Sequence, residues 1–152
     1  MKNNVLIVEN ERATAFALSE GLAEDGYSIK AVPSSEAALR FLKGRKCDLI
    51  ITDISLPGIN GIELLKRVSA RRKIPSIVIT ACGSQDAADA AKEAGAVKFF
   101  SKPFKVDEVK RSVAQALISR APAATTRSSE PSTVRSASRT NGSDPAKSRS
   151  RR

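Results

Sequence analysis

The chain has 152 residues, enough for one domain and too few for two of ordinary size. It carries 26 Lys and Arg residues against 16 Asp and Glu residues, a formal net charge of +10. It contains no histidine, which excludes a histidine base, ligand or phosphocarrier of its own, and its two cysteines cannot form a zinc site by themselves. No stretch approaches the roughly 18 apolar residues that span a bilayer, and the N-terminus runs directly into a short strand-like segment. We therefore expect a soluble, cytoplasmic protein.

The C-terminal part of the chain differs sharply in composition from the rest. Residues 121–152 contain seven basic and two acidic residues, eight serines and one aliphatic side chain larger than alanine, Val134. Such a segment cannot bury enough apolar surface to offset the entropy of ordering it, roughly 1–2 kcal/mol per residue for the backbone. We predict a folded domain over residues 1–120 and a disordered, basic, Ser/Arg-rich tail over residues 121–152.

The first half of the domain alternates between strand and helix patterns. The apolar, β-branched run over residues 5–8 predicts a strand covered on both faces. A helical stretch with apolar residues among alanines follows and ends at Asp25-Gly26. A strand over residues 27–32, a helix over residues 35–43 and a strand over residues 48–52 come next.

The second half continues the same alternation. Asn60 is expected to cap a helix, with Glu63 in a capping-box-like position, and residues 76–80 predict a fourth strand. An alanine-rich helix over residues 85–94 should end at Gly95, which suits a left-handed conformation. A fifth strand over residues 97–100 precedes a helix whose apolar face is Val106, Val109, Val113 and Leu117. The pattern predicts an α/β fold, a doubly wound five-stranded parallel sheet with five helices.

Polar side chains follow most of the predicted strands at their carboxyl ends, where open parallel sheets bind ligands. These side chains belong to Glu9–Glu11, Asp53, Thr80 and Lys102. The second strand ends in Val32-Pro33 and offers no such group. A strand order of 2-1-3-4-5 would therefore make the four polar-ended strands contiguous and gather their side chains in one site.

Clustered carboxylates suit Mg²⁺, which commonly takes one or two protein carboxylates together with phosphate oxygens. A lysine and a hydroxyl could hold the remaining phosphate oxygens. The sequence has no P-loop and no Gly-rich dinucleotide fingerprint, so the phosphate is not expected to arrive as a bound nucleotide. An aspartate nucleophile that forms an acyl phosphate is the simplest reaction compatible with these residues.

The segments VLIVENE, DLIITDISLPGINGIELL, IVITACGS and KEAGAVKFFSKPF resemble the receiver domain of bacterial two-component response regulators, the CheY-like superfamily, over residues 3 to about 119. AGAVKFFSKPF is most similar to receivers of the nitrogen-regulator and nitrogen-fixation type. The resemblance implies a flavodoxin-like fold and phosphorylation by a sensor histidine kinase or phosphotransfer protein. Since residues 121–152 are too polar to form a DNA-binding recognition-helix domain, we expect a stand-alone regulator. The resemblance also implies signalling by protein–protein contact through helix 4, strand 5 and helix 5. It implies no enzyme activity beyond self-catalysed phosphoryl acceptance and slow autodephosphorylation.

The resemblance also assigns roles to individual residues. Asp53 would be the phosphoacceptor, and Mg²⁺ would be held by Glu9, Asn10, Asp53 and the backbone carbonyl of Ser55. Thr80 and Lys102 would bind phosphoryl oxygens. Phe99 would be the aromatic switch residue, although an aromatic in a strand is as often a plain core residue. The peptide bond before Pro103 would be cis.

Asn10 departs from the family pattern, which usually has a second acid at this position. Losing one charge should weaken Mg²⁺ binding, by less than the roughly 4 kcal/mol of one ion pair at 4 Å and an effective dielectric constant near 20. A phosphorylation-impaired docking module is therefore an alternative function, and nucleic-acid binding by the basic tail is another.

Cys47 and Cys82 should lie roughly 15 Å apart, too far for a disulfide. Cys82 is read as a small residue beside the pocket, or alternatively as a redox handle.

Overall fold

The computed structural model describes residues 2–120, and the predicted basic tail over residues 121–152 lies outside this range. The strands are β1 (Asn4–Val8), β2 (Ser28–Val32), β3 (Leu49–Thr52), β4 (Ser76–Thr80) and β5 (Ala96–Ser101). The helices are α1 (Arg12–Glu24), α2 (Ser35–Leu42), α3 (Gly61–Ser69), α4 (Gln85–Glu93) and α5 (Val106–Arg120). The predicted alternation of strands and helices is confirmed. Within residues 2–120, no helix combines the length and apolar composition needed to cross a membrane.

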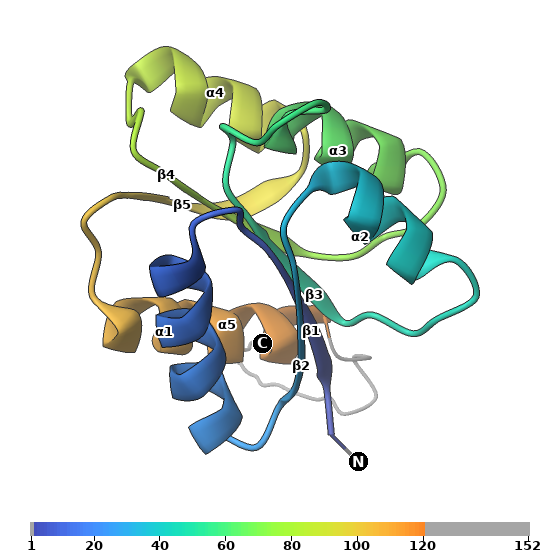
Figure 1. Cartoon of the computed structure of the whole chain (residues 1–152), viewed down its shortest axis with the longest axis vertical. Coiled ribbons are helices and arrows are strands. Elements are labelled where there is room, and N and C mark those ends of the chain that lie inside the picture. The colour runs from blue at the N-terminus through green and yellow to red at the C-terminus, as the bar shows by residue number, and fades with distance from the viewer. Residues whose placement is uncertain (1, 121–152) are drawn as a thin grey trace, which may run out of the picture. The chain divides into compact units, whose positions relative to one another are not determined.

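The strands form a single five-stranded sheet in the order β2-β1-β3-β4-β5, and every neighbouring pair is parallel. This is the predicted order, with β1 and β3 at the centre. Helices α1 and α5 cover one face of the sheet, and α2, α3 and α4 cover the other (Figure 1). Since all strands are parallel, their carboxyl ends lie along one edge, where β1, β3, β4 and β5 are followed by polar residues.

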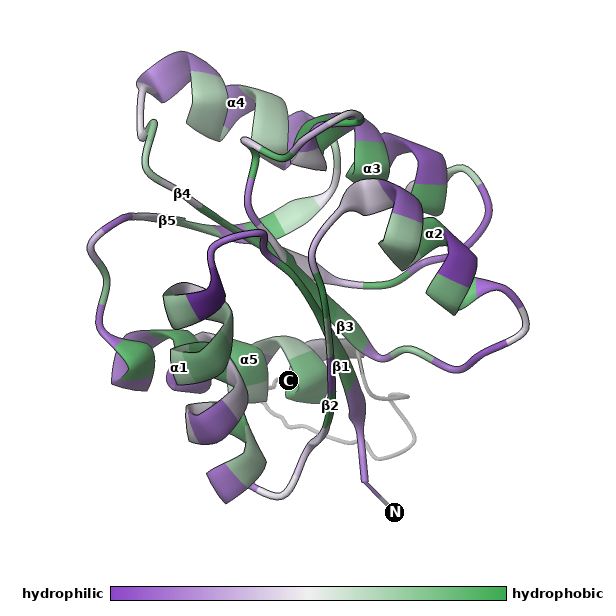
Figure 2. Ribbon diagram, in the orientation of Figure 1, coloured by the Kyte–Doolittle hydropathy of each residue, from purple (hydrophilic) through white to green (hydrophobic). Residues whose placement is uncertain are grey.

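The central strands are buried on both faces, and their side chains alternate between two apolar clusters. On the α2–α3–α4 side, Leu6, Val8, Ile50 and Val78 pack together, with Phe99 partly buried against them. On the α1–α5 side the cluster consists mainly of Val5, Ile7, Leu18, Leu22, Leu49, Ile51, Ile77, Ile79, Val109 and Val113. Figure 2 shows the same division, with apolar central strands between helices that turn their polar residues outward.

The turn from β3 to α3 is shaped by close backbone approach. The Asn60 side chain accepts a hydrogen bond from the Glu63 N–H at 2.9 Å and so caps α3 as predicted. The Glu63 carboxylate instead forms an i, i+4 ion pair with Arg67 at 3.2 Å. Of the predicted capping box, the hydrogen bond to the Asn60 side chain is therefore confirmed, and the return bond from Glu63 is not. A Cβ atom at Gly61 would lie 1.9 Å from the carbonyl oxygen of Asp53. The close approach of the Asp53 backbone therefore requires glycine at the position where α3 begins.

Candidate functional site

The carboxyl edge of the sheet brings together residues that are far apart in the sequence. Glu9 follows β1, Asp53 follows β3, Thr80 ends β4, and Lys102 follows β5. Glu9, Asp53 and Thr80 are buried, with exposed fractions of 5%, 6% and 0%. Buried carboxylates are costly unless they are paired, so their partners define what the site can do.

Lys102 supplies the positive charge at the centre of this site. Its Nζ atom lies 2.9 Å from Oδ2 of Asp53, 3.0 Å from Oε1 of Glu9 and 3.3 Å from Oε1 of Glu11. Burial alone lowers the pKa of the Lys102 ammonium, but the hydrogen bonds to Asp53 and Glu9 outweigh this and raise the pKa above its ordinary value. The lysine therefore remains charged and holds the carboxylates together.

The carboxylate of Asp53 is fixed at both of its oxygens. Oδ2 receives the Lys102 ammonium, and Oδ1 accepts a hydrogen bond from the backbone N–H of Ser55 at 3.1 Å. The backbone N–H of Asp53 donates to the carbonyl of Val8 at 3.1 Å, which ties the residue to the end of β1. Asp53 is thus held in one orientation at the centre of the sheet edge.

Glu9 is likewise held at both of its carboxylate oxygens. Its Oε2 atom accepts the backbone N–H of Glu11 at 3.0 Å, and its Oε1 atom contacts Lys102. Burial raises the pKa of Glu9 above its ordinary value, and the nearby charge of Asp53 adds to this, while the hydrogen bonds from Glu11 and Lys102 oppose it. A second cation near Glu9 and Asp53 would offset the same cost.

Glu11 joins the site, as expected for the polar run after β1, although the resemblance assigned it no individual role. Its side chain is 59% exposed and contacts Lys102, and it also accepts a hydrogen bond from the Thr14 hydroxyl. The hydrogen bonds from Thr14 and then Lys102 lower the pKa of Glu11 below its ordinary value. Its position, third in the polar run after β1, places it at this edge of the sheet, but that position does not predict its contact with Lys102.

Thr80 and Phe99 lie on the same side of the sheet. The register pairs Thr80 with Ser101 and Val78 with Phe99, so both side chains project toward the α2–α3–α4 face. The Thr80 Oγ1 atom accepts a hydrogen bond from the Cys82 N–H at 3.3 Å. The bond from Lys102 to Pro103 is cis, as predicted.

The donor set is compatible with Mg²⁺. Within residues 2–120, no group of three or more His, Cys, Asp and Glu side chains is arranged to hold a metal ion. Glu9 and Asp53 nonetheless supply two buried carboxylates around one cation, and one or two protein carboxylates are what Mg²⁺ commonly takes. Asn10 is exposed and adds no charge to this pair.

The two cysteines are both free, so the predicted absence of a disulfide between them is confirmed. Cys47 is buried, its thiol donates to the Leu49 carbonyl at 3.4 Å, and burial raises its pKa. Cys82 is exposed and follows β4 next to the site. The two thiols therefore differ strongly in access to solvent.

Comparison with protein families gives a match over most of the domain. The model described as response regulator receiver domain matches residues 5–114. Sporulation initiation phosphotransferase F of Bacillus subtilis is 33% identical over 114 residues, which cover 74% of this chain and 92% of that protein. The transcriptional regulatory protein FixJ of Rhizobium meliloti is 37% identical over 102 residues, 66% of this chain and 50% of FixJ. The chain thus spans nearly all of the first relative and about half of the second.

Solved structures of response regulators also resemble this chain. A response regulator from Chloroflexus aurantiacus J-10-fl aligns with a TM-score of 0.72 at 33% identity, over 78% of this chain and 99% of that one. The structure of FixJ-N aligns with a TM-score of 0.70 at 33% identity, over 78% of this chain and 95% of that one. The sheet order and the five helices agree with these folds.

Proposed function

Because this chain belongs to the response regulator receiver domain family, we propose that it accepts a phosphoryl group on Asp53 from a sensor histidine kinase or a phosphotransfer protein. One observation carries the proposal. Asp53 is buried at the end of a central strand, with Lys102 2.9 Å away on one oxygen and the Ser55 N–H 3.1 Å away on the other. This arrangement presents an oriented carboxylate nucleophile beside a fixed positive charge.

In the proposed reaction, a carboxylate oxygen of Asp53 forms a bond to phosphorus while the bond from phosphorus to the donor breaks. The electron pair of that bond leaves with the donor, an imidazole or a small carboxylate. Lys102 already contacts Oδ2 of Asp53 and pairs with a phosphoryl oxygen after transfer, and the Thr80 hydroxyl binds another.

Mg²⁺ is the proposed cofactor, and Glu9, Asp53, Asn10 and the Ser55 carbonyl would hold it. When bound, it neutralises charge on the phosphoryl oxygens as they approach the two buried carboxylates. Asn10 keeps a carbonyl oxygen at its position but no charge, so this chain should bind the ion more weakly than a receiver with an acid there.

The proposed output surface consists of α4, β5 and α5. Ala91 is the single buried residue within α4, so this helix has little apolar side chain to hold it in place. Phe99 is partly buried on β5, on the same sheet face as Thr80. Movement of Thr80 toward a phosphoryl group and of the Phe99 ring behind it would alter this surface.

The proposal extends to the location of the protein, its activity and its type of receiver. We propose a cytoplasmic protein with no catalytic activity beyond phosphoryl acceptance and slow autodephosphorylation, which signals through protein–protein contact. A nitrogen-regulator type of receiver is compatible with the relatives FixJ and NtrC, at 37% and 32% identity, but the identity to the sporulation relative, 33%, lies between these two values.

The chemical nature of the adduct tests this proposal. After incubation with Mg²⁺ and a small ³²P-labelled acyl phosphate, we expect label on the protein that neutral hydroxylamine removes, because hydroxylamine cleaves acyl phosphates. Label that survives hydroxylamine would be a serine or threonine ester and would contradict it. No label at all, with an Asn10→Asp variant labelled normally, would favour the docking-module alternative.

A further inference from the structure

Positive charge is strongly segregated within the folded domain. Residues 1–120 contain 19 basic and 14 acidic residues. Nine of the basic residues lie in two eight-residue segments, 39–46 and 66–73, and neither segment contains an acidic residue. The remaining residues up to 120 have ten basic and 14 acidic side chains, a net charge of −4. Two short segments therefore account for the positive charge of the domain.

The fold brings these two segments together. Residues 39–46 end α2 and lead toward β3, and residues 66–73 end α3 and lead toward β4. The Arg72 guanidinium joins them, since it donates to the carbonyl of Leu42 at 3.0 Å and to that of Arg45 at 2.8 Å. The side chain of Arg72 thus fixes the spacing between the two basic segments.

A groove of about 960 Å³ lies between the two segments. Its basic lining consists of Lys43, Arg45, Lys46, Arg67, Arg71 and Arg72, and we call it the basic groove. Leu39, Leu42 and Val68 contribute apolar side chains to its lining. No acidic residue lines it. All charged side chains that line this groove are therefore positive, and the groove is large enough to hold part of a ligand.

Most of this charge is available at the surface. Lys43, Lys46 and Arg71 are exposed. Arg45 is also exposed, and its guanidinium lies 4.8 Å from the centre of the Phe41 ring, which orients it without neutralising it. Arg67 has an acidic partner, Glu63, at 3.2 Å, in an exposed pair of low strength.

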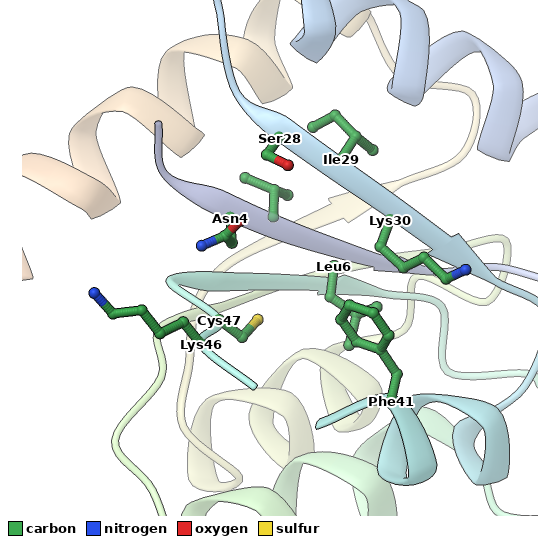
Figure 3. A pocket seen from close by; sticks show the side chains of 9 residues that line it. Asn4, Leu6, Ser28, Ile29, Lys30, Phe41, Lys46 and Cys47 are labelled. Atoms are coloured by element: carbon green, nitrogen blue, oxygen red, sulfur yellow. The ribbon is translucent and has the colours of Figure 1, made fainter. Parts of the chain in front are cut away.

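A smaller cavity shares Lys46 with the groove and lies against β1 and β2 (Figure 3). Its lining includes Phe41 and Cys47, and its volume is about 50 Å³, enough for a few water molecules. This volume is too small for an organic ligand.

We propose that the basic groove binds the phosphate backbone of duplex DNA. Duplex DNA carries one negative charge per roughly 1.7 Å of axis, whereas an extended acidic peptide carries at most one per roughly 3.3 Å. A groove with six basic side chains and no acid matches the denser and more uniform of these two charge patterns. The contacts would be to phosphates, so binding would be independent of base sequence.

This site is separate from the carboxylate site. The basic groove is formed by the segments that enter β3 and β4, whereas Asp53 and Thr80 lie where these strands end. The proposal therefore does not depend on phosphorylation of Asp53. It is also distinct from binding by residues 121–152, because the residues that form the groove all lie within the folded domain.

The test is fluorescence anisotropy of a labelled mixed-sequence duplex of about 20 base pairs with the full chain over a range of salt concentrations. The variant Lys43→Gln/Lys46→Gln/Arg71→Gln removes three exposed charges from the basic groove. The control Lys92→Gln/Lys105→Gln/Arg111→Gln removes three exposed charges elsewhere in the domain. Both variants keep residues 121–152, so any contribution from that segment is the same in each.

We expect the groove variant to bind the duplex at least about tenfold more weakly than the control variant does. The slope of log K against log salt, which is negative, should become shallower by roughly 2.7, about 0.9 for each lost phosphate contact. The control should change the slope by less than one contact. Equal binding by the two variants would overturn the proposal. So would a groove variant that loses more affinity for polyglutamate than for the duplex, since that result would assign the groove to an acidic protein.

Discussion

The Nζ atom of Lys102 lies 2.9 Å from Oδ2 of Asp53, an ion pair that connects the ends of β5 and β3 across β4. The same ammonium contacts Glu9 at 3.0 Å, so one cation serves two buried carboxylates. The site therefore depends on a single residue for its electrostatic balance, and loss of that residue leaves two acids facing each other.

Replacing Lys102 with methionine should destabilise the fold by about 1–3 kcal/mol, because Glu9 and Asp53 would lose their shared cation. Urea unfolding followed by circular dichroism measures this change. The control is Lys105→Met, which removes an exposed lysine three residues away and should have little effect. An unfolding midpoint for Lys102→Met equal to that of the control would contradict the electrostatic role of Lys102.

The raised pKa of Glu9 predicts a specific pH dependence. Above the ordinary value near 4.5 and below the raised folded value, the folded chain binds more protons at this carboxyl than the unfolded chain does. Its contribution to the free energy of unfolding therefore falls as the pH rises through this interval, by at most about 1.4 kcal/mol per pH unit. Glu9→Gln should abolish that fall.

Unfolding midpoints measured across this pH interval test the Glu9 prediction. The control is Glu63→Gln, which removes an exposed carboxylate from a surface ion pair. Parallel pH profiles for the parent and Glu9→Gln would show that burial of Glu9 does not penalise its charged form.

Much of this arrangement could be predicted because each element carries a local signal. Apolar β-branched runs identified the strands, Asn60 and Gly95 identified helix ends, and polar residues after the strands identified Asp53 and Lys102. The contact of Glu11 with Lys102 could not be predicted, since both side chains are long and their meeting depends on rotamers.

The basic groove was missed for a different reason. Each of its segments, 39–46 and 66–73, appears in the sequence as an ordinary charged helix end. Only the packing of α2 beside α3, and the hydrogen bonds from Arg72 to the carbonyls of Leu42 and Arg45, make them one surface. Such long-range placement is not encoded in local periodicity.

Asn10→Asp should strengthen Mg²⁺ binding, measured by isothermal titration calorimetry. Solvent compensates much of the added attraction, so we expect a gain of about tenfold, equal to about 1.4 kcal/mol. The control Asn3→Asp adds the same charge at the opposite end of β1. An unchanged affinity in Asn10→Asp would mean that position 10 does not contribute to the metal site.

The two cysteines should differ in reactivity toward Ellman's reagent. Cys82 is exposed and should react in the native protein, whereas Cys47 is buried with a raised pKa and should react after unfolding in urea. Native Cys82→Ser should therefore release little thiolate, and native Cys47→Ser as much as the parent. Rapid reaction of Cys47 in the native protein would contradict its burial in the structure.

The most direct test of the central claim is the intact mass of the protein after incubation with Mg²⁺ and a small acyl phosphate. Asp53→Asn removes the proposed phosphoacceptor, and Asp48→Asn makes the same change at the other end of β3. We predict one added phosphoryl group on the parent and on Asp48→Asn, and none on Asp53→Asn. A phosphoryl adduct on Asp53→Asn equal to that on the parent would contradict the assignment of Asp53.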